Sequence, residues 1–222
     1  MTKHLKRDLE GLERRVLLLA GQVEETFRRS IAALLERRVE LARRVIEGDR
    51  QIDLSEVEIE EECLHTLALH QPLAFDLRFV VAVLKINNDL ERIADLAVNI
   101  AERALSLFSR PEIVPVPARF HDFMDSAARM LRESIDAFVR GDARLARAVC
   151  AKDDGIDQTN REIIADLLRL MHEDSRSIDQ ALELISVSKN IERIADHATN
   201  IAEDVVYLVE GDIVRHRLEV VR

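Results

Sequence analysis

Eight acidic residues stand in four pairs along the chain, and the two members of each pair are four positions apart. The pairs are Asp49 with Asp53, Glu91 with Asp95, Asp153 with Asp157, and Glu192 with Asp196. On an α-helix, residues with this spacing lie one turn above each other, so both carboxylates face the same way. Carboxylate oxygens suit hard cations, namely Mg, Mn, Ca or ferric iron, better than Cu or structural Zn. The pattern therefore indicates metal binding.

The acidic pairs belong to an internal repeat. Residues 91–102 read ERIADLAVNIAE, and residues 192–203 read ERIADHATNIAE. A second similarity relates residues 28–53 to residues 132–157 and aligns the other two acidic pairs with each other. Self-similarity of this kind indicates one structural unit used twice. The proline-rich residues 109–118 predict a stiff, non-helical connector, so we expect a first domain over 1–110 and a second over 111–222.

The composition predicts an all-α protein, because 47% hydrophobic and 33% charged residues with only 6 Gly and 4 Pro leave little material for turns. Apolar residues recur at steps of three and four, which places a buried stripe on each helix. The two cleanest stripes are Ile86, Leu90, Ile93, Ala97, Ile100, Ala104, Leu107 and Val187, Ile191, Ile194, Ala198, Ile201, Val205, Leu208. We expect two tandem, internally repeated three-helix bundles built from six long helices.

Helix boundaries follow from the same pattern and from the turn-forming residues. The first helix is expected to run over about 40 residues to Gly48–Asp49, where a glycine stop precedes an N-cap residue. The second helix should end before Pro72, and the third should span about 73–108. In the second half of the chain, we expect Gly141–Asp142 to bend or split the counterpart of the first helix.

The helix register predicts that the acidic pairs of each half meet. In an antiparallel hairpin, residues equidistant from the turn lie side by side, because both helices rise about 1.5 Å per residue. The midpoint between the pairs is Pro72 in the first half and falls between Asp174 and Ser175 in the second. Four carboxylates per half should therefore cluster on an outer surface, where their repulsion favours a bound cation. Glu102 and Glu203 either extend these clusters or end the acidic stripe.

The acidic pairs and their neighbours also allow interpretations other than metal binding. A pair of acids on an exposed helix is commonly a solvated face without a ligand. Arg92 and Arg193 lie beside the acids and would partly neutralise them as ion pairs. The repeated amides Asn99 and Asn200 are expected to make inter-helix hydrogen bonds rather than to bind metal.

Charge and cysteine content restrict the class of protein. The net charge of −10 argues against a nucleic-acid partner, because phosphate backbones are bound by clustered Lys and Arg. Cys63 and Cys150 lack metal-binding spacing and read as small buried side chains in a reducing compartment. No apolar run has the length of a signal or membrane span. We expect a cytoplasmic protein without direct membrane insertion, and no motif predicts catalytic turnover.

The duplicated ERIAD and NIAE segments, the D-x-x-I-D element before each, and QPLAFDLR at 71–78 resemble the PhoU family over nearly the whole chain. The resemblance implies two similar three-helix bundles carrying surface metal clusters, expected to be multinuclear iron, with Mg, Mn, Ca or Zn as alternatives. The family's metal motifs fall on the same eight acids described above. Ala94 and Ala195 stand where the family commonly has glycine. QPLAFDLR has no second copy, so Asp76 and Arg78 receive no assigned role.

The resemblance also implies a regulator rather than an enzyme. Members of the PhoU family negatively regulate phosphate uptake and phosphate-starvation signalling, and so take part in phosphate homeostasis. The implied partners are the ATPase of the phosphate ABC transporter and a phosphate-sensing histidine kinase, and we expect a homodimer.

Two other functions use parts of the same sequence pattern. A ferritin-like di-iron oxidase needs two Glu-x-x-His elements that face two further Glu residues inside one bundle. Only Glu62 and His65 fit that element, and it is not repeated. The other rival is a metal-free helical adaptor.

Overall fold

The computed structural model describes residues 3–109, 111 and 114–211, and within them it contains helices and no strand. The elements are α1 (Lys3–Leu35), α2 (Val39–His70), α3 (Ala74–Phe108), α4 (Arg119–Arg140), α5 (Ala143–Cys150), α6 (Asp153–Glu173), the short 3₁₀ helix η1 (Ser175–Ser177) and α7 (Ile178–Glu210). The all-α prediction is confirmed. The second half repeats the first, with α5 and α6 together in the place of α2.

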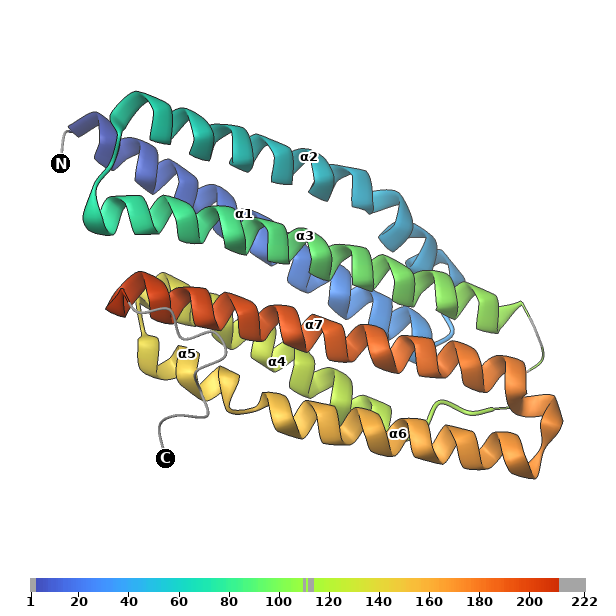
Figure 1. Ribbon diagram of the computed structural model, residues 1–222. Helices are drawn as coiled ribbons and strands as arrows, with labels where there is room; N and C mark the ends of the chain where they lie inside the picture. Colours follow the sequence, from blue (N-terminus) through green and yellow to red (C-terminus); the bar gives the residue numbers. More distant parts are fainter. Residues whose placement is uncertain (1–2, 110, 112–113, 212–222) are drawn as a thin grey trace.

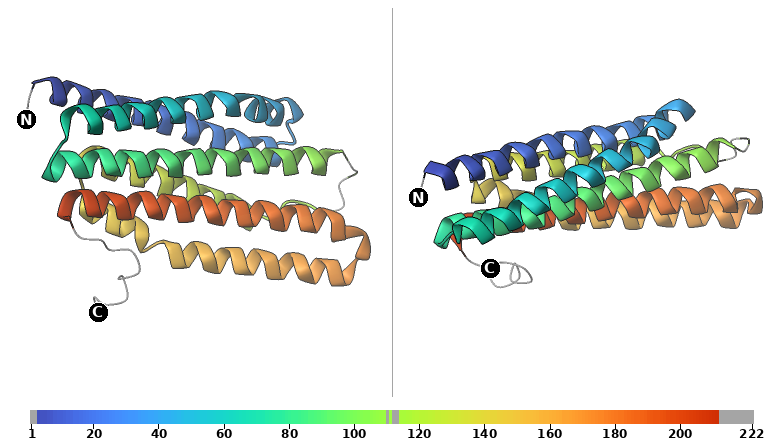
Figure 2. Two further views of the ribbon diagram at one scale, coloured as in Figure 1. Left: turned by 45° about the horizontal axis from the view of Figure 1, so that its top comes forward. Right: turned by 90° about the horizontal axis from the view of Figure 1, so that it is seen from above.

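The helices form two layers that are shared by both halves. In Figure 1, α2, α3, α7 and α6 lie side by side in one layer, and α1 and α4 lie behind α3 and α7. Figure 2 shows the same arrangement from two other directions. α3 and α7 run in opposite directions and pack against each other, while each also packs against the other helices of its own half. The two repeated helices thus form the centre of the molecule.

The hydrophobic core follows the two predicted stripes. Every member of both stripes is buried, and the most exposed of them retains only 7% of its accessible surface. One cluster of buried apolar side chains contains residues from both halves, because α3 and α7 share their buried faces. The division at residue 110 stays a prediction.

The boundary between α1 and α2 was wrongly predicted. α1 ends at Leu35, and the chain passes through Gly48–Asp49 inside α2 without a break. The turn instead uses Arg37 in a left-handed conformation with φ 52°, and no glycine marks it in the sequence. A single glycine inside a helix costs only about 1 kcal/mol, so packing can carry the helix through Gly48.

The other predicted turns are confirmed. The chain reverses between α2 and α3 around Pro72, and between α6 and α7 through η1. Gly141, with φ 58°, ends α4, and the Asp142 carboxylate then caps α5 by accepting a hydrogen bond of 2.9 Å from the Leu145 N–H. Both hairpins therefore have the register that the acidic pairs require.

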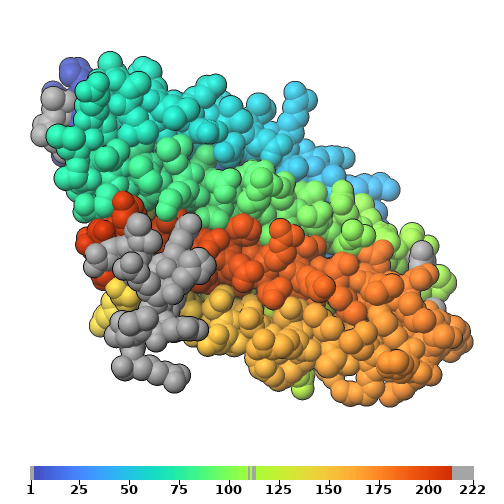
Figure 3. Space-filling view, viewed as in Figure 1, coloured from blue at the N-terminus to red at the C-terminus, as the bar shows by residue number. Residues whose placement is uncertain are grey.

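The four helices of the front layer extend along one broad face of the molecule. Figure 3 shows α3 and α7 as adjacent bands along this face, between α2 and α6. Cys63 and Cys150 are buried as expected, and burial is the first cause that raises their pKa values, to about 12 and about 11. None of the described helices combines the length and apolar character that crossing a bilayer requires.

Candidate functional site

The first carboxylate cluster lies where α2 and α3 pack against each other. Asp49 and Asp53 come from α2, and Glu91 and Asp95 come from α3. Burial, followed by repulsion from Asp53, Asp95 and Glu102, raises the pKa of Asp49. Two of these three neighbours are on α3, so the acids of the two helices lie close enough to repel each other. Glu102 extends the cluster.

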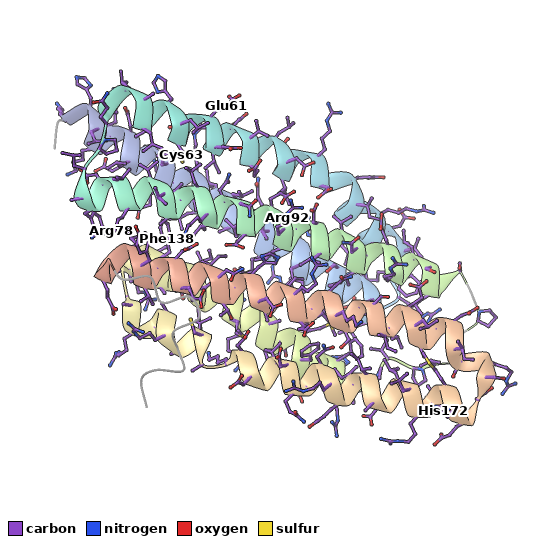
Figure 4. All side chains as sticks on the ribbon, viewed as in Figure 1. Glu61, Cys63, Arg78, Arg92, Phe138 and His172 are labelled. Carbon is purple, nitrogen blue, oxygen red and sulfur yellow. The ribbon has the colours of Figure 1, made fainter. Side chains whose placement is uncertain are left out.

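Arg92 lies on the exposed side of α3 and pairs with two acids of the first cluster (Figure 4). Its Nε is 3.4 Å from Glu91 Oε2, and its Nη1 is 3.2 Å from Asp95 Oδ2. Burial and then Asp95 raise the pKa of Glu91, while Arg92 opposes that shift. The expected neutralisation by arginine therefore occurs here. Exposed ion pairs contribute little free energy, so Arg92 remains easily displaced.

The second cluster lies at the equivalent contact between α6 and α7. Asp153 and Asp157 lie in the first turns of α6, and Glu192 and Asp196 lie midway along α7. Burial raises the pKa of Asp153, whereas a 3.1 Å hydrogen bond from Thr199 Oγ1 to Asp153 Oδ1 opposes the shift. This bond ties the two helices together at the cluster.

In the second cluster, the carboxyl group of Asp196 has the most strongly raised pKa. Burial, then repulsion from Asp153, Glu192 and Asp157, raises the pKa of Asp196 to about 6, and His197 opposes the shift. The second cluster thus holds more negative charge than its surroundings readily stabilise.

The oxygen donors of both clusters suit a hard cation, although they do not form a finished coordination shell. Asp49 Oδ1 is buried and has no hydrogen-bond partner within the described structure. Leaving such an oxygen unpaired costs about 1–3 kcal/mol, and a cation would remove that cost. Among the described residues, no three His, Cys, Asp or Glu side chains already converge on one point. Metal binding would therefore require side-chain rotation, and it stays a prediction.

The Glu-x-x-His element does not face the interior of a bundle. Glu62 Oε2 lies 2.7 Å from Arg15 Nε, and His65 is exposed. The pair is therefore part of the surface of α1 and α2, and it lacks the inward placement that a di-iron oxidase uses.

Polar contacts that helical periodicity does not predict join α3 and α7. His197 Nδ1 lies 2.8 Å from Asp89 Oδ1, and Asn200 Nδ2 donates to the same oxygen at 3.4 Å. The inter-helix bond expected for Asn200 is confirmed. Lys85 Nζ lies 2.8 Å from Asp204 Oδ1, and Asp89 and Asp204 are 6% and 2% exposed. In the sequence, the only sign of these contacts is that acidic residues stand beside the apolar stripes. Their partners lie in the other half of the chain, so the spacing along one helix does not identify them.

Arg78 of the QPLAFDLR segment also joins the two halves. Its Nε donates a 3.3 Å hydrogen bond to the carbonyl oxygen of Leu208 at the end of α7. Next to it, Phe79 stacks on Phe138 of α4 with ring centroids 5.9 Å apart, and Figure 4 shows Arg78 and Phe138 at the same end of the molecule. This segment therefore packs α3 against the second half.

Comparison with known proteins gives a consistent result. The family model described as the PhoU domain matches residues 16–104 and 120–205. The PhoU homolog of Aquifex aeolicus, named a phosphate-specific transport system accessory protein, is 40% identical over 96% of this chain and 96% of its own. The accessory protein PhoU of Escherichia coli is 35% identical over 97% of this chain and 91% of its own.

Two solved structures share the fold. The crystal structure of PhoU from Pseudomonas aeruginosa superposes with a TM-score of 0.91 at 37% identity, covering 93% of this chain and 99% of that one. The phosphate transport system regulatory protein PhoU from Streptococcus pneumoniae gives a TM-score of 0.88 at 30% identity, covering 95% of this chain and 99% of the other.

Proposed function

The chain belongs to the PhoU family, and from that premise we propose that it negatively regulates phosphate uptake and phosphate-starvation signalling. Its relatives are named accessory proteins of a phosphate-specific transport system, which supports a role in regulating that system. We further propose that it acts as an adaptor between the ATPase of the phosphate ABC transporter and a phosphate-sensing histidine kinase. The layered helices would offer a rigid surface for both partners.

We also propose that the two carboxylate clusters hold hard metal ions, with multinuclear iron as the first expectation. The proposal is carried by one observation: the same four-acid arrangement is built twice, at equivalent helix contacts, from helices whose register brings the acids close enough to repel each other. The unpartnered Asp49 Oδ1 supports it. When bound, the metal would supply positive charge and an open coordination position for phosphate oxygens.

The residues of the chain have distinct roles in this proposal. Asp49 and Asp53 would bind from α2, and Glu91 and Asp95 from α3, so one ion would link two helices of the bundle. In the second half, Thr199 orients Asp153 toward α7 through its 3.1 Å hydrogen bond. Arg92 balances the charge of the first cluster and would turn toward solvent when a cation binds.

The first experiment is elemental analysis of protein purified without chelators. The double variant Glu91→Ala, Asp95→Ala should lose most of the metal of the first cluster, because half of its proposed ligands are removed. The matched control is Glu10→Ala, Glu13→Ala on α1, which also removes two acids about one turn apart, the exposed Glu10 and the half-buried Glu13. We expect the control to retain the metal content of the unmodified chain. No stoichiometric metal, or equal metal in the two variants, would refute the site.

The regulatory part of the proposal is tested with the transporter ATPase. A pull-down with purified ATPase should capture the unmodified chain, and phosphate titration should change the spectrum of its bound metal. Failure of the ATPase to be retained would contradict the adaptor role. A metal spectrum that does not respond to phosphate would contradict the open coordination position.

A further inference from the structure

A polar cleft of about 600 Å³ lies where α2, α3 and α7 meet, and neither carboxylate cluster accounts for it. Glu56 and Glu60 of α2 line one side, while Asn87 and Asp89 of α3 and His197 of α7 line the other. Its volume is in the range of small-molecule sites and far larger than a single ion requires. The residues that line the cleft come from both halves of the chain, on α2, α3 and α7, which are helices of the front layer in Figure 1.

Apart from the exposed Asn88 amide, the donor side chains that line this cleft each have a hydrogen-bond or ion-pair partner within the protein. Asn87 Nδ2 donates to the carbonyl oxygen of Glu56 at 2.9 Å and to Glu56 Oε1 at 3.3 Å. His197 and Asn200 both contact Asp89 Oδ1, and the ammonium of Lys85 pairs with Asp204. The protein therefore has few donors left to offer a ligand here.

Hydrogen-bond acceptors in the cleft, by contrast, outnumber the donors that remain available. Asn87 is 1% exposed, lines the cleft, and its Oδ1 has no hydrogen-bond partner within the described residues. Glu60 likewise has no hydrogen-bond or ion-pair partner among them. Burial, followed by repulsion from Glu60 and Asp53, raises the pKa of Glu56, which shows that negative charge is crowded on this side. A ligand must bring both donors and positive charge.

These features exclude most ligand classes. Within the described residues, an anion would meet Glu56, Glu60 and Asp89, while the ammonium of Lys85 in the cleft lining already pairs with Asp204. A single metal ion would occupy only a small part of a cleft of about 600 Å³, so the size of the cleft favours a larger ligand. Carboxylates on two sides of the cleft favour a ligand with more than one positive group, and each ammonium group donates up to three hydrogen bonds.

We propose that this cleft binds a linear polyamine, with one ammonium group at Glu56 and Glu60 and another near Asp89 and the amide oxygen of Asn87. The ligand would bridge α2 and α3 of the first half to α7 of the second. Binding would therefore hold the two halves together at their central contact. This inference does not depend on metal binding by the two clusters.

Titration calorimetry of the full chain with spermidine, at near-physiological salt, tests the proposal. Glu60→Gln removes one charge from the cleft and should weaken spermidine binding about tenfold, the effect expected for one charge-assisted hydrogen bond. The matched control is Glu61→Gln, whose side chain projects from the outer edge of α2 in Figure 4. We expect the control to bind like the unmodified chain.

Nuclear magnetic resonance locates the ligand independently of affinity. Spermidine should shift the side-chain amide signals of Asn87 and Asn200 in the unmodified chain and in the Glu91→Ala, Asp95→Ala variant, which leaves the cleft intact. Equal affinity for Glu60→Gln and Glu61→Gln would overturn the proposal, because it would indicate general attraction to a chain of net charge −10. Shifts spread over the acidic surface, with none at the two asparagines, would overturn it as well.

Discussion

At the scale of single residues, the carboxylates of the two clusters oppose folding unless a cation is bound. The pKa values of Asp49, Glu91, Asp153 and Asp196 are all raised, with burial and neighbouring acids as the common causes. A raised carboxyl pKa means that the folded protein binds a proton more readily than the unfolded chain does. Each of these groups therefore destabilises the fold once it is ionised.

Asp196 gives this effect a measurable pH dependence. Its pKa is raised to about 6 in the folded chain, against about 3.9 for an unperturbed Asp. The stabilising contribution of its proton is present below pH about 4 and is lost as the pH rises through about 6. In the presence of a chelator, we expect the melting temperature to rise as the pH is lowered from about 7 to about 5.

Substitution isolates the contribution of Asp196. Asp196→Asn should raise the melting temperature of the metal-free chain at pH 7 and flatten its pH dependence, because the amide cannot ionise. Asp125→Asn, on the exposed side of α4, serves as the control and should keep the original pH dependence. Thermal unfolding at several pH values measures the melting temperature of both variants. The same pH dependence in both would contradict the attribution of this effect to Asp196.

At the scale of elements, the two halves form equivalent turns with different residue types. Arg37 and Gly141 both adopt a left-handed conformation, with φ 52° and 58°, after the first long helix of their half. Glycine takes this conformation without steric cost, whereas other L-residues pay for it. Arg37 also lies with its guanidinium 5.0 Å from the centre of the Phe108 ring, a contact that partly offsets the cost.

Gly141 should therefore be intolerant of a side chain. Its added Cβ would meet only Val209 at an ordinary 3.9 Å, so the cost of Gly141→Ala comes from the backbone alone. We expect a loss of about 1–2 kcal/mol in the free energy of unfolding. Gly21→Ala, inside α1 and with open space around the new Cβ, should instead gain up to about 1 kcal/mol. Urea unfolding gives both values, and equal signs would contradict this account.

At the scale of the whole molecule, α3 and α7 make the two halves into one packed unit. Their shared apolar faces form a common core, and buried Asp89 and Asp204 on its edge are each matched to a polar partner on the other helix. A buried acid without its partner is costly, so these contacts select one arrangement of the two halves.

Substitution of Lys85 tests whether these polar contacts stabilise the arrangement of the two halves. Lys85→Met keeps the length of the side chain but removes the ammonium that pairs with Asp204, and should cost about 1–3 kcal/mol in the free energy of unfolding. The control Lys189→Met, at an exposed position of α7, should change the value by less than about 0.5 kcal/mol. Denaturant unfolding measures both, and an equal effect of the two substitutions would show that the inter-half ion pair contributes nothing specific.

Much of this fold was predictable because it is encoded by local periodicity. The stripes on residues 86–107 and 187–208 indicated the buried faces, and Pro72 and Asp174–Ser175 indicated the hairpin turns, from which the meeting of the acids followed. The α1–α2 turn was not predictable, because Arg37 carries no glycine-like signal. Packing of neighbouring helices, rather than local propensity, sets that boundary and carries α2 through Gly48.

The sequence by itself determined the repeated all-α architecture, the eight candidate ligands and their register, because helical spacing turns residue number directly into position. Only the tertiary structure decided which contacts join the halves: Asp89 with His197, Lys85 with Asp204, and the cleft lined by Glu60 and Asn87. Asp89, Lys85, His197 and Asp204 differ in type from their counterparts in the repeat, and the two members of each contact lie about half a chain apart. Nothing in local periodicity relates such positions, so only the packing of α3 on α7 brings them together.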